Sequence, residues 1–163
     1  FSLNKEEALF GFIGNIRKTR CVAIFDSPGN LKQQGLVTLF ANSDYIICPY
    51  HYDRTTIPST ATFIAFLQKL KNVMAGKMNA RLILVPNRHD ARVGRRSELM
   101  LWEETRETFS RYGLVTPKIN SRADMERFCT LSDLDGQLEV TQAAFDTIFK
   151  EIFGHIEADT ENG

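Results

Sequence analysis

Two polar segments of the chain contain the residue types that phosphate and nucleotide chemistry needs. The first is Asp26-Ser27-Pro28-Gly29, which directly follows the apolar run 21–25. A carboxylate that ends a buried strand is costly unless its charge is used. In phosphate-binding α/β proteins such an aspartate orders Mg²⁺, and the glycine after it lets a loop approach the γ-phosphate. The tetrapeptide also fits a simple turn, because all four residue types are common in turns.

The second segment, 86–90 (PNRHD), follows the apolar run 82–85. The side-chain amide of Asn87 can hydrogen-bond to a purine base. Asp90 can accept from the N1–H and the exocyclic amine of guanine, a donor pattern that adenine does not present. A polar loop in which Asn87 is only a turn residue remains the alternative.

Hydrophobic periodicity predicts the elements that must position these segments. Fully apolar strands that alternate with amphipathic helices indicate a parallel sheet covered on both faces, so the predicted fold class is α/β, with a mostly parallel sheet flanked by helices. Right-handed crossovers bring the carboxyl ends of the strands to one edge, where ligands bind in such folds. The predicted strands are 21–25, 45–48 (ended by Pro49), 81–85 and 114–116, and the predicted helices are about 5–16, 59–76, 97–112 and one beginning at Thr141 with Phe145, Ile148 and Phe149 in the core.

Composition and charge restrict the class of protein. The chain has 163 residues with 20 basic and 20 acidic side chains, and 43% of its positions are hydrophobic. This length suits one domain, and the composition excludes a wholly disordered, collagenous or coiled-coil chain. A net charge of zero excludes a uniformly basic nucleic-acid binder but leaves room for a local basic patch.

The cysteines and histidines predict neither a disulfide scaffold nor a metal site. Both residue types lack the close paired spacing that zinc ligands have. We expect the thiols to be small buried groups in a reducing cytoplasm. No apolar run is long enough to span a membrane, and no signal peptide is visible. The residues concerned are Cys21, Cys48, Cys129, His51, His89 and His155.

Four motifs, in this order, resemble the ParA/MinD family of partitioning ATPases, which have a deviant phosphate loop. Family members read D-x-P-G or D-x-P-P, then a stretch that ends at a proline, then a strand that ends in Asn-Arg or Asn-Lys, and finally a loop that closes over the base. The resemblance covers residues 20–156 or so and implies an incomplete P-loop NTPase-like fold. The matching segments are 26–29 (DSPG), 41–49 (ANSDYIICP), 82–88 (LILVPNR) and 115–122 (VTPKINSR).

The resemblance implies roles for particular residues. Asp26 would be catalytic and would hold Mg²⁺ through water, and Gly29 would respond to the γ-phosphate. ATP would close a homodimer that binds DNA non-specifically, and a DNA-bound adaptor protein would activate hydrolysis, without membrane association. The implied nucleotide-binding residues are Asn87, Arg88, Pro117, Lys118 and Ile119.

The sequence departs from the family at its phosphate loop. No G-x-x-x-x-G-K-[ST] motif occurs in the chain, so the backbone N–H cradle, the phosphate lysine and the Mg²⁺-binding hydroxyl are not encoded here. The chain also begins with Phe1. We therefore expect 1–156 to be the carboxyl-terminal part of such a domain and 157–163 to be an acidic flexible tail. ATP and Mg²⁺ would bind only with the phosphate loop supplied, and this chain alone would be inactive.

Arginines are concentrated in one loop and at the following helix start, at Arg88, Arg92, Arg95 and Arg96. Cations at the amino end of a helix oppose its macrodipole, so stability is a poor reason for them. Partitioning ATPases bind DNA through surface cations that neutralise phosphates. We therefore expect Arg92, Arg95 and Arg96 to bind DNA, with a merely solvated loop as the alternative.

Two other functions remain open. Asp26-x-x-Gly29 and Asn87-x-x-Asp90 fit the D-x-x-G and N-K-x-D pattern of GTPases, with arginine in place of lysine. The chain can also be a degenerate α/β scaffold that binds DNA or protein without catalysis.

Overall fold

The computed structural model describes residues 6–33, 35–90, 92, 95–126 and 136–160. These residues form two compact units. The first unit consists of Phe1–Ile46 and Phe66–Ala80, and the second unit consists of Ile47–Ala65 and Arg81–Gly163.

A three-stranded parallel sheet is the centre of the fold, with the strand order β1-β2-β3. The strands are β1 (Tyr45–Tyr50), β2 (Arg81–Pro86) and β3 (Leu114–Val115). In the pairing of β2 with β3, Ile83 lies opposite Leu114 and Leu84 opposite Val115. Every residue of β2 after Arg81 is buried, as expected for a central parallel strand with both faces covered. The predicted α/β class is therefore confirmed.

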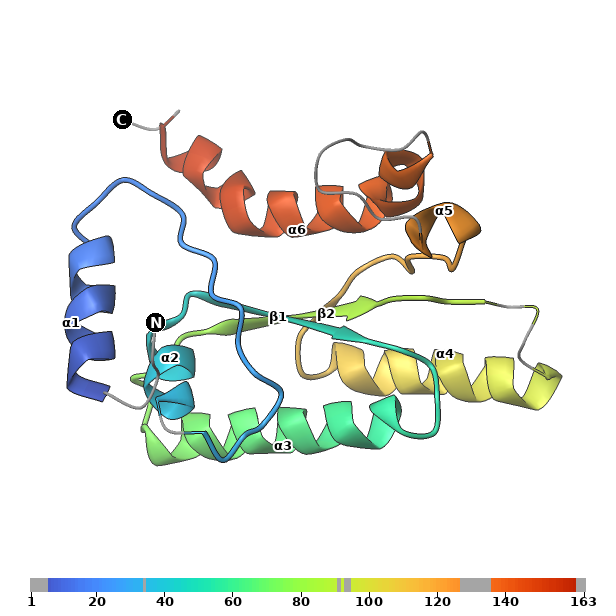
Figure 1. The fold of residues 1–163 in the computed structure, drawn as a ribbon, viewed down its shortest axis with the longest axis horizontal. Helices are drawn as coiled ribbons and strands as arrows, with labels where there is room; N and C mark the ends of the chain where they lie inside the picture. The colour runs from blue at the N-terminus through green and yellow to red at the C-terminus, as the bar shows by residue number, and fades with distance from the viewer. Residues whose placement is uncertain (1–5, 34, 91, 93–94, 127–135, 161–163) are drawn as a thin grey trace. The chain divides into compact units, whose positions relative to one another are not determined.

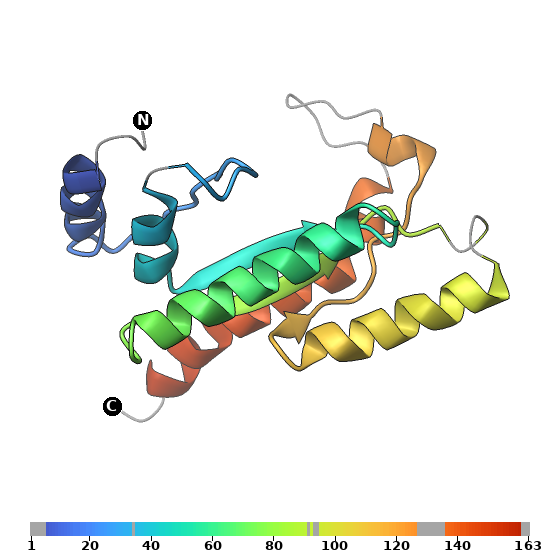
Figure 2. The same ribbon diagram turned by 90° about the horizontal axis from the view of Figure 1, so that it is seen from below.

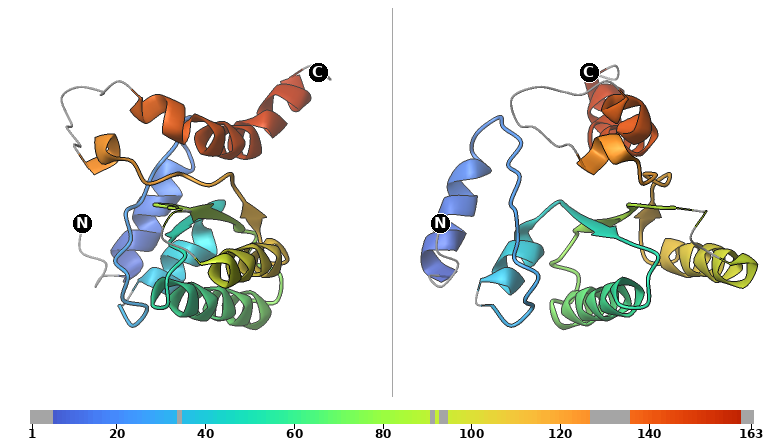
Figure 3. Two further views of the ribbon diagram at one scale, coloured as in Figure 1. Left: turned by 90° about the vertical axis from the view of Figure 1, so that its right-hand side faces the viewer. Right: turned by 45° about the vertical axis from the view of Figure 1, so that its right-hand side comes forward.

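Helices cover both faces of this sheet (Figure 1). The first half of α3 and the whole of α4 lie on one face, and α6 lies on the other, as the end-on view in Figure 3 also shows. Seen from below, the first half of α3 lies in front of the strands and α6 behind them, with α4 beside α3 (Figure 2). These helices are α3 (Thr56–Val73), α4 (Arg96–Ser110), the single turn α5 (Ala123–Glu126) and α6 (Gln137–Thr160).

The core of the second unit is built on β2. The chain can approach β2 closely at Gly113 because glycine has no Cβ atom. A Cβ atom at this position would lie 2.4 Å from the carbonyl oxygen of Leu82. Only glycine fits so near a neighbouring backbone. The buried residues of this core include Tyr50, Leu82, Ile83, Leu84, Val85, Phe109, Ile119, Ala144 and Ile148.

The first unit contains α1 (Glu6–Ile16), α2 (Leu36–Asn42) and the second half of α3. Helices α1 and α2 pack against each other. Arg17 directly follows α1, and its guanidinium donates to the carbonyl oxygen of Asn42 at 2.7 Å. The apolar core of this unit includes Leu9, Ile13, Leu36, Leu39 and Phe40.

The predicted strand at 21–25 is wrong. Residues 21–28 have no regular secondary structure, and the side chains of Val22 and Ile24 are 65% and 92% exposed. A strand is stable only when a neighbour takes up its backbone hydrogen bonds. Residues 22–29 make no backbone hydrogen bond to any other described residue. Asp26 therefore does not end a buried strand.

Three smaller predictions are also corrected. Pro49 does not end β1 but lies within it. Proline has no backbone N–H to donate, and β1 tolerates it because an edge strand does not use all of its N–H groups in the sheet. Thr141 does not cap α6, because the helix begins four residues earlier, at Gln137. The hydroxyl of Thr141 donates instead to the carbonyl oxygen of Gln137 at 2.9 Å. Phe145 and Phe149 are exposed, because the face of α6 that contains Ile148 is the buried one.

The thiols and the carboxyl-terminal residues differ in part from the predictions. Cys21 is exposed, not buried, and Cys48 is half-buried, which raises the pKa of its thiol to about 11. Cys129 lies outside the described residues, as do 161–163, whereas α6 extends to Thr160. Within the described part of the chain, none of the helices combines the length and the apolar character that crossing a membrane requires.

Candidate functional site

The candidate site lies at the carboxyl ends of β2 and β3, where the chain after one strand runs beside the chain after the other. The Ile119 amide donates to the Pro86 carbonyl oxygen at 2.8 Å, and the His89 amide donates to the Ile119 carbonyl oxygen at 3.0 Å. A third bond joins the Ser121 amide to the His89 carbonyl oxygen at 2.9 Å, and His89 forms a parallel bridge with Asn120. The two segments that the resemblance assigns to the base are thus held together.

Asn87 is held where the loops after β1 and β2 meet. Its backbone amide donates to the carbonyl oxygen of Tyr50 at 2.8 Å. Its side-chain oxygen accepts from the Arg88 amide at 2.8 Å, and Arg88 has the left-handed φ of 51°. Asn87 is therefore a turn residue, as one interpretation of the sequence predicted. Its amide nitrogen has no hydrogen-bond partner among the described residues, so its two N–H donors remain available.

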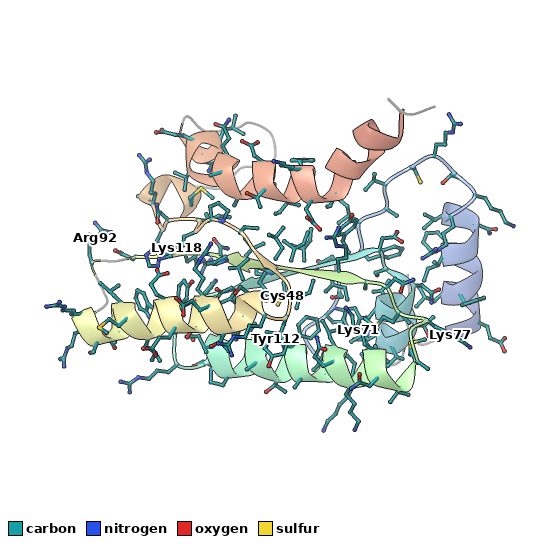
Figure 4. All side chains as sticks on the ribbon, turned by 180° about the vertical axis from the view of Figure 1, so that it is seen from behind. Cys48, Lys71, Lys77, Arg92, Tyr112 and Lys118 are labelled. Atoms are coloured by element: carbon teal, nitrogen blue, oxygen red, sulfur yellow. The ribbon has the colours of Figure 1, made fainter. Side chains whose placement is uncertain are left out.

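Lys118, a predicted nucleotide-binding residue, forms an ion pair with Glu103 on α4. This pairing lowers the pKa of the Glu103 carboxyl. The Lys118 ammonium also lies 5.9 Å from the centre of the Tyr52 ring, within the range of a cation–π contact. Lys118 and Arg92 lie at the same end of the second unit (Figure 4). Lys118 therefore links the loop after β3 to α4.

His89 is surrounded by aromatic side chains that sequence reasoning did not connect. Its ring lies 5.6 Å from that of Tyr52 and 5.4 Å from that of Trp102, both edge-to-face, and these two rings stack on each other. Burial, followed by the charge of Lys118, lowers the pKa of His89. Its Nδ1 atom is buried and has no hydrogen-bond partner among the described residues. The cluster comes from three separate segments, so no local pattern predicted it.

Three of the four clustered arginines have local partners, including Arg88 through its amide. Arg92 donates through Nε and Nη2 to the two carboxylate oxygens of Asp90, both at 2.9 Å. These hydrogen bonds lower the pKa of Asp90 to about 2. The Arg95 amide donates to the carboxylate of Glu98 at 2.8 Å, which satisfies one N–H group at the start of α4. Because both oxygens of Asp90 bind Arg92, guanine would compete with this guanidinium for the carboxylate.

The predicted DNA-binding residues lie at this same end of the second unit. Arg95 and Arg96 are exposed where α4 begins, and the Arg92 side chain is 84% exposed although it pairs with Asp90. Their binding to DNA stays a prediction.

An open cavity of about 550 Å³ lies where the two loops leave the sheet. It is next to the segments predicted to hold the base but extends one to four residues further along each loop. Sequence reasoning singled out His89, Asp90 and the arginines among its residues, and for other roles. The cavity is lined chiefly by His89, Asp90, Arg92, Asn120, Ser121 and Arg122.

Asp26 and Gly29 lie in the first unit, on the exposed segment that follows α1. The catalytic and metal-binding roles implied for them stay predictions, without the buried strand on which the reasoning for Asp26 depended. Among the described residues, no three His, Cys, Asp or Glu side chains are grouped to bind a metal ion.

The fold and the site define an α/β protein with a polar cavity at the edge formed by the loops after β2 and β3. Comparisons with protein-family models, with curated proteins and with solved structures gave no match.

Proposed function

We propose that this chain is part of a ParA-like ATPase that partitions or positions plasmid, mobile-element or chromosomal DNA. The adenine of ATP would bind at the carboxyl edge of β2 and β3, and ATP would close a homodimer that binds DNA. The phosphate loop would have to come from another segment, because these 163 residues contain no such motif.

One observation carries this proposal. The two segments assigned to the base by resemblance, Asn87–Arg88 and Pro117–Ile119, are 30 residues apart in sequence yet lie side by side at the sheet edge. The bond from the Ile119 amide to the Pro86 carbonyl oxygen fixes their register. The amide nitrogen of Asn87, which has no partner among the described residues, supplies donors for the ring nitrogens of adenine.

The proposal can be tested without the phosphate loop, because the base has its own contacts. Adenosine is added to the isotope-labelled chain, and amide shifts are followed by NMR. We expect saturable shifts at Asn87 and at 118–119. Asn87→Ala should weaken binding by about 5- to 30-fold, the equivalent of one or two hydrogen bonds. Asn72→Ala, which removes an exposed asparagine from α3, is the matched control and should have no effect.

Other results would reject the proposal. Shifts confined to other surfaces, or no shifts at millimolar adenosine, would rule out base binding at this edge. Guanosine is added in a parallel titration. Tighter binding of guanosine, lost in Asp90→Asn, would favour the GTPase alternative, although the engagement of Asp90 by Arg92 argues against it.

A further inference from the structure

His89, which lines the cavity beyond the segments assigned to the base, has an unsatisfied polar atom. The Nδ1 atom of His89 is buried and lacks a hydrogen-bond partner among the described residues. Such atoms are rare in folded proteins, because each costs the desolvation energy of a polar group. The rings of Tyr52 and Trp102 pack edge-to-face against the histidine. Because none of the described residues supplies a partner for Nδ1, water or a ligand can supply one.

The charge of the cavity identifies the kind of ligand. Arg92 is balanced by its bidentate pair with Asp90. Arg122 lines the same cavity, is exposed, and has no ion pair with any other described residue. With His89 neutral, the lining residues have a net charge of +1, so the site repels cations and attracts anions.

We propose that this cavity binds a small phosphate-type oxyanion, inorganic phosphate or the phosphate group of a small molecule, through His89, Ser121 and Arg122. The anion would accept from the imidazole Nδ1–H, from the guanidinium and from the serine hydroxyl. Arginine suits such a ligand because its planar fork matches two phosphate oxygens. The volume of about 550 Å³ is in the range of small-molecule sites.

This site is separate from the proposed adenine contacts. Adenine would bind through Asn87 and 117–119, whereas the oxyanion would bind further out along both loops, at His89 and at 121–122. The two proposals can therefore succeed or fail independently, and their probes share no chemical group.

Anion binding should be coupled to the protonation of His89. The imidazolium form can donate from Nδ1, so binding should strengthen as the pH falls from about 8 to about 5. Bound oxyanion should raise the pKa of His89 and oppose the burial that lowers it. The ionisable and charged groups around this histidine are Lys118, Glu103, Asp90, Arg92, Arg122 and Tyr52.

The test is an NMR titration of the His89 imidazole, with and without sulfate or inorganic phosphate, at constant ionic strength. Sulfate does not titrate in this pH range, so any pH dependence of its binding reports on the protein. We expect saturable binding, a raised His89 pKa at saturation, and affinity at least about tenfold weaker in Arg122→Gln. His89→Phe, which keeps the aromatic packing, should remove the pH dependence. Arg111→Gln, which removes an exposed arginine at the end of α4, should bind sulfate as the original chain does.

Three results would overturn the proposal. The first is no saturable binding by about 10 mM anion. The second is an equal loss in Arg122→Gln and Arg111→Gln, which would indicate general surface charge. The third is a His89 response to duplex DNA but to neither small anion, which would make the cavity a contact for the nucleic-acid backbone.

Discussion

Replacing Gly113 with alanine tests the packing that brings the two site loops together. The new Cβ would lie 2.4 Å from the Leu82 carbonyl oxygen, 2.9 Å from Leu82 Cβ and 3.0 Å from its carbonyl carbon. Ordinary contact begins at 3.4 Å, so the carbonyl oxygen must withdraw by about 1 Å. It belongs to the backbone of β2 and cannot rotate away. That movement disturbs the neighbouring pair Ile83–Leu114.

We expect Gly113→Ala to lower the free energy of unfolding by about 2–4 kcal/mol, from overpacking plus a weakened ladder hydrogen bond. For a chain of this size the midpoint of thermal unfolding should fall by about 5–15 °C. Urea denaturation followed by circular dichroism measures the change, and an unchanged slope shows that the denatured state is unaffected. The amide signals of 119–121 should shift as well, because β3 sets their register against β2.

Gly154→Ala is the matched control, since it makes the same substitution in α6 of the same unit. The added Cβ would meet only Lys150 Cγ at 3.6 Å, an ordinary contact. Because alanine is the better helix former, this variant should gain about 0.5–1 kcal/mol. If Gly113→Ala were as stable as the original chain, the close approach of residue 113 to β2 would be refuted.

Three further predictions concern individual side chains. At pH 8, peptide mapping after alkylation should find Cys21 modified much faster than Cys48, because burial holds the pKa of Cys48 at about 11 and leaves little thiolate; equal rates would contradict the burial. Lys118→Met should raise the pKa of His89 in an NMR titration, although burial should still keep it below about 6.5. Asp90 should stabilise the fold fully above about pH 4 and progressively less as the pH falls towards 2, and Asp90→Asn should flatten that part of a stability–pH curve.

The sequence predicted the elements whose stabilising interactions are local or follow from burial on both faces. The apolar run at 81–85 became the central strand β2, and the amphipathic pattern at 97–112 became α4. The run at 21–25 has a similar composition, but it forms no strand. A strand depends on a partner for its hydrogen bonds, and composition does not reveal whether that partner is present.

The candidate site could be predicted only in outline. Asn87 was placed at the ligand edge because the carboxyl ends of parallel strands meet there, and Lys118 was placed near the base by the resemblance alone. The environment of His89 was not predictable, since Tyr52 and Trp102 reach it from other segments of the chain. The bidentate pairing of Asp90 with Arg92 was also missed, although the two are only two residues apart. Both depend on side-chain directions that a linear pattern does not encode.

The exposed segment 21–29 has a consequence for how the protein behaves in concentrated solution. Val22 and Ile24 face solvent on a stretch whose backbone donors and acceptors bond to no other described residue. A short β-branched segment of this kind can pair edge to edge with the same segment of another molecule. Its neighbours Arg20 and Asp26 place one charge at each end of the run. Charged flanking residues of this type hinder stacking in register, so they act as gatekeepers that delay aggregation.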